Sequence, residues 1–495
     1  MLWNDLREYL DKLDELGMLT KIQGADWDEE IGAISELMIE RGGPALVFDN
    51  IPGYPEGFRV TANIAQKPQF EALALGLDHE QPLARIAEEW ERVIGACELV
   101  PPHEVPDGPV FENVLTGDDI DLFKFPTPKW HDKDQGRYIG TGSCVIQRDP
   151  DSGWVNVGCY RVVVHDKNTC GIFMNSNNHG AQIREMYWKR GEKCPVVVSV
   201  GQEPILQLMS GGGVYHAGYG QSEFDVAGYL HKEPYPVIKG PVTGLPIPAT
   251  AEIVIEGFIP SPQERMEPEG PFGEWTGYYG HGRRPETVIE VAAIYHRDDP
   301  IISGEPPVRH IRAYKQLRGT DGRTKARLEK SGIQGIRGVS VVARPGFYAV
   351  SLKQMYEGHV EDVMRVLEPG GDARTGNRTW VLVDEDIDPA NTPEVLWAIA
   401  TRLIPEHGVT VIPGTSMDQL DPRIPPGMES DPSAEGRRKY SAHNLVINAC
   451  RPYAWIDQFP KVNINSRELR ESVEAKWSWL FEGLPPVGSD RTYAN

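Results

Sequence analysis

A change in hydrophobic pattern along the chain restricts the possible folds more than any other feature. From about residue 137 to residue 303, runs rich in valine and isoleucine alternate with glycine-rich turns, and helical patterns are few. The runs predict strands at 138–148, 154–165, 194–201, 251–259 and 286–296. Several short strands separated by loops are typical of a β-barrel or a β-sandwich.

Both flanks of this region follow a different pattern, in which helices and strands alternate. The N-terminal flank begins with a helix that Asn4 is expected to cap and Gly17 to end, and a strand pattern follows at 44–48. The C-terminal flank shows strand patterns around helices near 359–367 and 393–403. Such alternation is typical of α/β domains.

Two proline-rich connections, at 100–109 and at Pro306–Pro307, divide the chain. Because 495 residues are too many for one ordinary core, we predict an α+β, α/β multidomain protein with a central barrel-like domain. The predicted parts are an N-terminal α/β segment (1–110), a central β domain (111–307), a linker helix (308–330) and a C-terminal α/β domain (331–495).

The charge and the apolar content limit the possible partners. The formal net charge of −22 makes nucleic acid and anionic membranes poor partners. No apolar run approaches the ~18–20 residues of a membrane span, and the N-terminus is an acidic amphipathic helix rather than a signal peptide, so we expect a cytoplasmic protein with no membrane contact. The six cysteines show no C-x-x-C spacing, which argues against a thiolate zinc site or a disulfide framework. An anionic ligand would need a local positive field from arginine, lysine, a metal or helix N-termini.

The run WVNVGCYRVVVHD places two polar residues, Asn156 and Arg161, within a valine-rich strand pattern. A buried arginine needs a partner. Gly158 could host a β-bulge that turns both side chains toward one site. The alternative is an edge strand with an exposed arginine.

Two predicted helix starts carry residues that can bind a metal. Asn177 or Asn178 could cap a helix with His179 in its first turn, where histidine can bind a metal or serve a structural role. Ser222 could cap a second helix with Glu223 in its first turn, where an acid also simply complements the helix dipole.

The segment EPEGPFGEWTGYYGHG at 267–282 is predicted to be a shaped loop, since Pro271 and its glycines disfavour helix and central strand. Glu269 and Glu274 suit acid–base chemistry if burial raises one pKa, and the aromatic residues could supply that apolar setting. The alternative is a solvated turn. The chain contains neither a Rossmann dinucleotide fingerprint nor a P-loop.

Four motifs in this order resemble the UbiD family of decarboxylases that use prenylated FMN. They are N-x-G-x-Y-R at 156–161, His179, S-E-x-x-x-A-G at 222–228 and E-G-P-F-G-E-x-x-G-Y-Y at 269–279. The resemblance implies a split β-barrel flavin-binding domain in the centre and a C-terminal α/β domain that dimerises, which agrees with the pattern above. It also implies reversible non-oxidative decarboxylation of an aromatic, heteroaromatic or α,β-unsaturated acid through a covalent adduct with prenylated FMN.

The resemblance assigns roles to the matched residues. Arg161, Glu269 and Glu274 fall on the catalytic arginine–glutamate–glutamate network, in which Glu274 protonates the carbon that loses CO2. Asn156, His179 and Glu223 fall on the positions that hold a divalent metal, usually Mn²⁺, beside the cofactor phosphate, with K⁺ often nearby.

The resemblance extends less directly to three further residues. Lys353 resembles a lysine that meets the cofactor phosphate, Thr141 with Arg161 is placed near the isoalloxazine ring, and His310 is placed in the substrate pocket. The implied partners are an aromatic acid, CO2, a flavin prenyltransferase that supplies the cofactor, and further copies of the chain in a homodimer or larger homo-oligomer.

Two other functions are compatible with the same residues. The metal set alone would suit a manganese-dependent hydrolase. A flavin domain without chemistry would suit a non-catalytic binding or assembly module.

Overall fold

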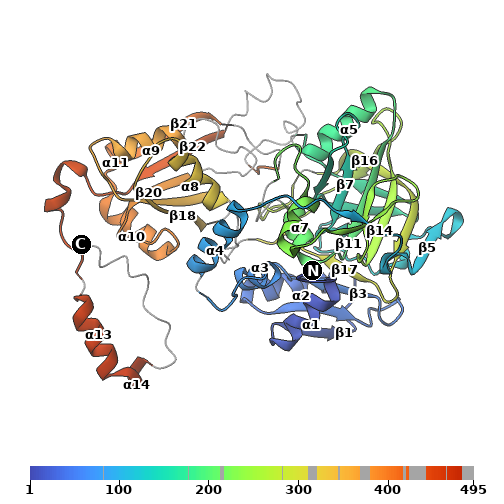
Figure 1. Ribbon diagram of the computed structural model, residues 1–495, viewed down its shortest axis with the longest axis horizontal. Helices are drawn as coiled ribbons and strands as arrows, with labels where there is room; N and C mark the ends of the chain where they lie inside the picture. The colour runs from blue at the N-terminus through green and yellow to red at the C-terminus, as the bar shows by residue number, and fades with distance from the viewer. Residues whose placement is uncertain are drawn as a thin grey trace. The chain divides into compact units, whose positions relative to one another are not determined.

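The computed structural model describes residues 1–81, 83–176, 178–211, 217–280, 282–309, 320–343, 346–367, 379–415, 420–422, 442–463 and 465–481. The chain forms two compact units (Figure 1). The first comprises Met1–Gly319 with Gln419–Glu429, and the second comprises Thr320–Asp418 with Ser430–Asn495. No helix among the described residues is long and apolar enough to cross a membrane.

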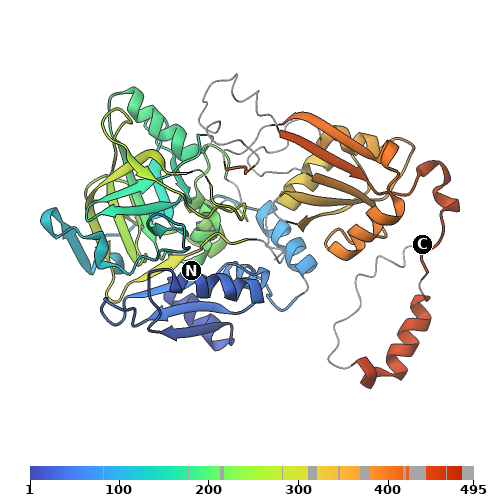
Figure 2. The same cartoon turned by 180° about the vertical axis from the view of Figure 1, so that it is seen from behind.

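The first unit begins with a small α/β layer. Its four-stranded sheet has the order β1-β2-β3-β17, and β17 returns from the end of the central region to pair in parallel with β3. The blue layer and the curled sheet described next lie side by side in Figure 2. The elements are α1 (Leu6–Glu15), β1 (Leu19–Gln23), α2 (Glu30–Arg41), β2 (Ala45–Asp49), β3 (Arg59–Ala62), α3 (Pro68–Ala74), α4 (Leu83–Gly95) and β17 (Ile301–Gly304).

A ten-stranded, mainly antiparallel sheet forms the centre of the first unit. Its main path is β6-β9-β10-β16-β14-β11-β7-β8, and β5 and β15 also pair with the long strand β16. The sheet curls into a half-barrel, so that β6 also contacts β11. The strands are β5 (Asn113–Thr116), β6 (Arg137–Gly140), β7 (Cys144–Arg148), β8 (Val155–Gly158), β9 (Val162–Asp166), β10 (Thr169–Ile172), β11 (Cys194–Val200), β14 (Ile253–Ile259), β15 (Glu267–Glu269) and β16 (Arg284–His296).

Three helices and a small sheet complete the first unit. The helices are α5 (His179–Lys189), α6 (Pro204–Ser210) and α7 (Glu223–His231), and the sheet consists of β13 (Pro246–Pro248), β12 (Pro236–Lys239) and β4 (His103–Glu104). Short 3₁₀ turns occur at Pro109–Phe111, Gly117–Asp119 and Leu122–Lys124.

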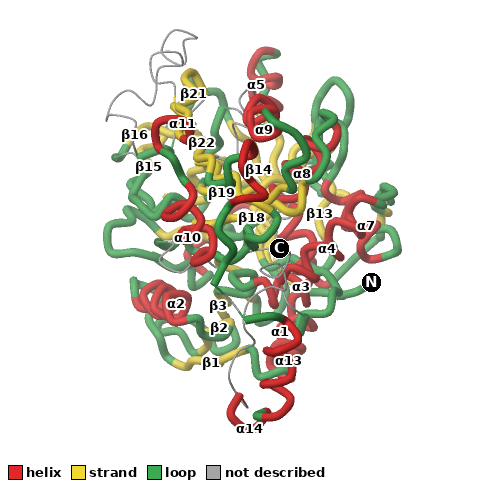
Figure 3. Tube along the Cα trace, turned by 90° about the vertical axis from the view of Figure 1, so that its left-hand side faces the viewer, coloured by secondary structure: helices red, strands yellow, loops and turns green. Residues whose placement is uncertain are grey.

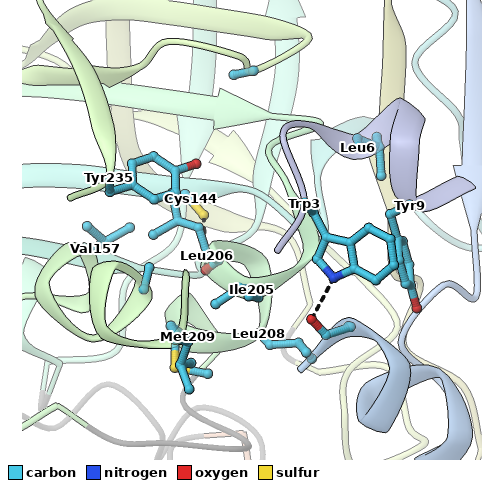
Figure 4. Packing of buried hydrophobic residues seen from close by; sticks show 14 of the residues in the cluster. Trp3, Leu6, Tyr9, Cys144, Val157, Ile205, Leu206, Leu208, Met209 and Tyr235 are labelled. Carbon is cyan, nitrogen blue, oxygen red and sulfur yellow. Dashed lines mark hydrogen bonds between the residues drawn. The ribbon is translucent and has the colours of Figure 1, made fainter. Parts of the chain in front are cut away.

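One buried apolar cluster joins the N-terminal layer to these helices. Figure 4 shows Trp3 and Tyr9 packing beside Leu208 of α6, with the Trp3 indole N–H donating to the carbonyl of Ala74 at 2.8 Å. The cluster also contains Val157 on β8, so the core that stabilises the N-terminal layer also supports the strand that carries Asn156. The site described below therefore rests on a packed scaffold.

The second unit is a separate α/β fold. Its five-stranded sheet has the order β18-β19-β20-β22-β21, and Figure 3 shows its helices in red and its strands in yellow. The elements are α8 (Thr320–Lys330), β18 (Ile336–Ala343), β19 (Phe347–Leu352), α9 (His359–Leu367), β20 (Thr379–Asp384), α10 (Thr392–Arg402), α11 (Pro405–Gly408), β21 (Val409–Thr415), β22 (Ala442–Asn448), a 3₁₀ turn at Tyr453–Gln458, α13 (Arg467–Lys476) and α14 (Ser478–Phe481).

The structure confirms the predicted fold class and corrects some details. The predicted strand 138–148 is two strands, β6 and β7, and the predicted strand 154–165 is β8 and β9. The first helix is capped by Asp5, whose side chain accepts from the Glu8 N–H, and not by Asn4. The predicted domain boundaries stay a proposal. Of the linker helix predicted at 308–330, residues 310–319 lie outside the described residues, and 320–330 form α8.

Candidate active site

The break between β8 and β9 directs Arg161 toward two glutamates more than a hundred residues away in sequence. Arg161 Nε and Nη2 donate to the two carboxylate oxygens of Glu269, each at 2.8 Å. Nη1 contacts Glu274 Oε1. All three side chains are buried or nearly so, with 10% exposure for the arginine and 1% and 6% for the two glutamates. The structure thus brings together the three predicted catalytic residues, and Arg161 is not the exposed arginine of the alternative interpretation.

The surroundings of Arg161 keep this group charged and fixed. Burial alone would lower the pKa of Arg161, but the carboxylates of Glu274 and Glu269 raise it above its ordinary value. Its guanidinium lies 4.2 Å from the ring centroid of Phe173 and 5.4 Å from that of Phe272. The bidentate pair with Glu269 sets the orientation of the guanidinium plane.

Tyr138 provides a further hydrogen bond to Glu269. Its hydroxyl donates to Glu269 Oε1 at 2.9 Å from strand β6, and burial together with the charge of Glu269 raises the pKa of this hydroxyl. Glu269 itself lies in β15, paired across from Arg284 of β16. Glu269 is therefore held by backbone pairing and by two side chains.

Glu274 lies in a narrow loop between β15 and β16. Its N–H donates to the carbonyl of Tyr278 at 2.8 Å, and the Gly280 N–H donates to the carbonyl of Phe272 at 3.1 Å. A Cβ atom built on Gly280 would lie 2.9 Å from Glu274 Cγ, so only glycine lets the chain pass this closely. The aromatic Phe272 is buried, whereas Tyr278 is 64% exposed. The segment is a shaped loop and not a solvated turn, as the functional interpretation predicted.

The proposed metal ligands lie around strand β8. Glu223, at the start of α7, accepts the N–H of Val157 at 2.8 Å and is only 7% exposed. Asn156 precedes Val157, is 2% exposed, and its side chain lies beside the buried hydroxyl of Tyr160. His179 begins α5, which packs against β7 and β8, and the Gly180 N–H donates to the Tyr160 hydroxyl at 3.2 Å.

These residues fit a divalent cation. Burial raises the pKa of Glu223 to about 8, so its charge is costly without a cation, and the buried amide of Asn156 can turn an oxygen toward one. Two oxygens and an imidazole suit a moderately hard ion such as Mn²⁺. Among the described residues, no three His, Cys, Asp or Glu side chains cluster as metal ligands, and the proposed set contains two of these with an asparagine as the third. Asn178 is the helix N-cap, and Asn177 lies outside the described residues.

The other predicted site residues have different outcomes. Thr141 lies between β6 and β7, and its hydroxyl oxygen accepts the N–H of Glu305 at 3.0 Å. Lys353 lies in the second unit, where its Nζ is 4.0 Å from Glu385 Oε1 and its side chain is 55% exposed. His310 lies outside the described residues. The roles of all three stay predictions.

Sequence reasoning did not identify Tyr138, Arg284 or Glu286 as parts of this site. Arg284 donates to Glu286 at 2.6 Å and lies 5.1 Å from the same Phe173 ring that Arg161 covers. The predicted strand began at 286 instead of 284, and a hairpin prediction around the loop would have placed Arg284 opposite Glu269. No sequence pattern around Tyr138 indicated that it belongs to this site.

Comparison with known proteins agrees with this arrangement. Residues 103–310 match the 3-octaprenyl-4-hydroxybenzoate carboxy-lyase Rift-related domain (UbiD), residues 10–90 match its N-terminal domain and residues 323–449 match its C-terminal domain. The phenolic acid decarboxylase of Escherichia coli O157:H7 is 32% identical over 479 residues, which cover 92% of this chain and 93% of that protein. The pyrrole-2-carboxylic acid decarboxylase of Pseudomonas aeruginosa is 29% identical over 520 residues, with 96% and 97% covered.

The fold is also similar to solved structures. The UbiD-class enzyme HmfF from Pelotomaculum thermopropionicum, in complex with FMN, superposes with a TM-score of 0.79 at 25% identity and covers 96% of this chain and 100% of its own. An evolved dimeric form of HmfF in complex with prFMN gives a TM-score of 0.77 at the same identity, again with 96% and 100% covered. Since the domain matches span most of the sequence and the relatives are covered almost end to end, this chain belongs to the UbiD family.

Proposed function

We propose that this protein decarboxylates an aromatic or heteroaromatic carboxylic acid, or an α,β-unsaturated one, and can run the reaction in reverse at high CO2. The observation that carries the proposal is one buried arginine shared by two buried glutamates, within a domain of a carboxy-lyase family. The overall change breaks the bond between the ring carbon and the carboxylate, leaves the electron pair on carbon and replaces CO2 by a proton.

The proposed cofactor is prenylated FMN, the group bound by HmfF. Thr141 and Arg161 would lie at its ring system, and Asn156, His179 and Glu223 would hold its phosphate through Mn²⁺. The assignment of Lys353 to the phosphate stays a prediction from the sequence. The buried Nε2 of Gln207 has no hydrogen-bond partner among the described residues, which supports an occupant near it. When bound, the cofactor supplies an electron sink for the pair released with CO2.

Arg161 has the central part in substrate binding. Three of the five N–H donors of the guanidinium go to Glu269 and Glu274, and the remaining two could donate to a substrate carboxylate. Glu269, fixed by Tyr138, keeps the guanidinium oriented.

Glu274 is the proposed proton donor. It contacts the same guanidinium, so a substrate carboxylate at Arg161 brings the reacting carbon near Glu274. After CO2 leaves, the Glu274 carboxyl gives its proton to that carbon.

Neither of the other two functions gains support. The relatives are named as decarboxylases, and a flavin is bound in the similar structures, in contrast to a metal hydrolase without a flavin. Burying the charges of one arginine and two glutamates costs desolvation free energy, and a binding module without chemistry would not need such a network.

Further parts of the proposal concern the protein's surroundings. We place it in the cytoplasm with a flavin prenyltransferase as cofactor supplier, with K⁺ near the metal, and in a homodimer or larger homo-oligomer. Exposed apolar side chains of α13, α14 and the residue between them support self-association, and they are Leu469, Val473, Trp477, Trp479 and Leu480.

The test uses protein co-expressed with a flavin prenyltransferase. CO2 release is followed against pyrrole-2-carboxylate, hydroxybenzoates and cinnamates, with the Glu274→Gln variant as the matched control. We expect flavin-like absorbance in both proteins and a loss of ~100-fold or more in the variant, the scale of a lost general acid. Wild-type activity in Glu274→Gln, or metal-dependent hydrolysis without a chromophore, would contradict the proposal.

A further inference from the structure

A short segment before β6, residues 131–135, is bonded to the loop that carries Glu274. The Gln135 N–H donates to the carbonyl of Pro271 at 3.2 Å, and the Tyr279 hydroxyl donates to Asp132 Oδ1 at 3.0 Å. The two segments are more than a hundred residues apart in sequence. Contacts at both ends of the loop make this segment a second support for the proposed proton donor, besides Arg161.

Asp134 is the centre of this support. Its side chain is fully buried, and its Oδ1 accepts the N–H of Gly273, the residue before Glu274, at 3.0 Å. Its Oδ2 accepts the backbone N–H of His131 at 3.1 Å and lies 3.1 Å from His131 Nδ1. Both oxygens therefore face N–H donors, which fixes the carboxylate and, through it, the backbone at Gly273.

His131 covers the other side of the same glycine. A Cβ atom built on Gly273 would lie 3.0 Å from both Nδ1 and Cε1 of the imidazole, so the ring rests directly on the loop backbone. The imidazole also has a hydrogen bond with the backbone of Pro307, in addition to Asp134 at its Nδ1. Burial lowers the pKa of His131, but the hydrogen bond and the charge of Asp134 outweigh it and raise the pKa overall, so they favour the protonated form of the imidazole.

We propose that Asp134 and His131 are positioning residues that hold the Gly273–Gly280 hairpin so that Glu274 can reach the reacting carbon. The inference rests on the proposed function, since it assigns the pair to proton delivery. The effect of both residues on Glu274 passes through the backbone at Gly273. A shift of about 1 Å there would cause a loss of ~10- to 100-fold in rate.

The first test measures the loop itself and needs no activity. In Asp134→Asn, the NH2 group replaces one of the two oxygens and faces either the Gly273 N–H or the two His131 nitrogens, so at least one contact is lost. Hydrogen exchange followed by mass spectrometry should show ~10-fold faster exchange in peptides covering 267–282 of the apoprotein. The control is Glu256→Gln, another buried carboxylate, which instead accepts from the Thr243 N–H and the Tyr295 hydroxyl. Unchanged exchange at 267–282 in Asp134→Asn, or the same increase in Glu256→Gln, would overturn the inference.

The second test measures turnover in cofactor-loaded enzyme. Asp134→Asn should lower kcat by ~10-fold or more with little change in KM or flavin content, and its solvent isotope effect on kcat should rise because proton delivery becomes slower. Glu256→Gln should lower the melting temperature without this change in kcat. A variant that loses only stability would show that Asp134 is merely structural.

A double-mutant cycle tests the packing of His131 on Gly273. The backbone of Gly273 is not left-handed, so alanine is tolerated there except for the contact with the imidazole. Gly273→Ala should lower kcat in the wild-type background. In the His131→Ala background, where the ring is absent, the same substitution should lower kcat little further. An equal loss of kcat in both backgrounds would contradict the inference.

If the wild type releases no CO2 from any acid, the proposed function fails, while the exchange measurement still decides whether Asp134 holds the loop.

Discussion

At the scale of single residues, the site has too few cations for its anions. One guanidinium, Arg161, already contacts Glu269 and Glu274, and a bound substrate would bring a third carboxylate to it. Like charges at short distance raise the pKa of the group that can most easily take a proton. We propose that this group is Glu274, which would give the proton donor its proton at the moment of substrate binding.

The corresponding prediction is proton uptake on binding. A saturated analogue such as cyclohexanecarboxylate, which cannot be decarboxylated by this route, should bind with uptake of about one proton near pH 7. Titration calorimetry in buffers of different ionisation enthalpy measures this number. Glu274→Gln should bind the analogue without the uptake. A heat of binding that is independent of the buffer in the wild type would contradict the charge argument.

Glu305 provides a prediction on stability. Its oxygens accept from Gln66 Nε2 at 2.7 Å and from the Ala65 N–H at 3.2 Å, yet burial raises its pKa to about 7. An unfolded glutamate titrates near ~4.3, so between these values the native state binds more protons than the unfolded state. The free energy of unfolding should therefore fall as the pH rises through this window.

The variant Glu305→Gln isolates this effect because glutamine does not titrate. From pH ~4.5 to ~7.5 the wild type should lose up to about 3 kcal/mol of stability relative to the variant. Urea unfolding at a series of pH values gives the free energy of unfolding of each protein as a function of pH. Parallel curves would show that Glu305 does not titrate in this range.

At the scale of elements, the hairpin between β15 and β16 determines where Glu274 lies. Gly280→Ala would place a Cβ atom 2.9 Å from Glu274 Cγ and 3.1 Å from its Oε1, and the carboxylate would have to move. We expect kcat to fall by ~10- to 100-fold with cofactor binding retained. Gly282→Ala is the matched control, since a Cβ atom there meets nothing within 4 Å. Equal activity of the two variants would contradict the close fit at Gly280.

The elements also show what the sequence could and could not predict. Local sequence located β11, β14, α9 and α10 to within a few residues, because the two strands are short apolar runs that are buried almost throughout and the two helices repeat apolar residues on one buried face. The interior strand β22 lay in a region interpreted as loop, since its place between β20 and β21 depends on pairing with strands far away in sequence. Pairing at such distance leaves no local pattern.

The site shows the same division between local and distant information. The motifs predicted Arg161, Glu269 and Glu274 as a group, but the tie from Tyr138 to Glu269 joins residues 131 positions apart. The bulge predicted at Gly158 is instead a complete interruption between β8 and β9, which lets Arg161 leave the sheet plane. The residues of the network were therefore predictable, whereas the contacts that fix their geometry were not.

At the scale of the whole molecule, the C-terminal helices present an apolar stripe to solvent. Leu469, Val473 and Trp477 recur at four-residue spacing along α13 and its end, with exposures of 51%, 39% and 43%. Leu480 in α14 is 53% exposed as well. Full burial of such side chains contributes ~1.5–3 kcal/mol each, so a second copy of the chain that covers the stripe would be held firmly.

We therefore predict that Val473→Glu shifts the protein toward its 55.2 kDa monomer, because it places a charge in the middle of the stripe. Light scattering after size exclusion, over a range of concentrations, measures the mass. Ala475→Glu adds the same charge to the same helix about 200° away, and it should remain associated like the wild type. Dissociation of both variants would indicate a general charge effect. A wild type that is monomeric at every concentration would show that the stripe does not bind a second copy.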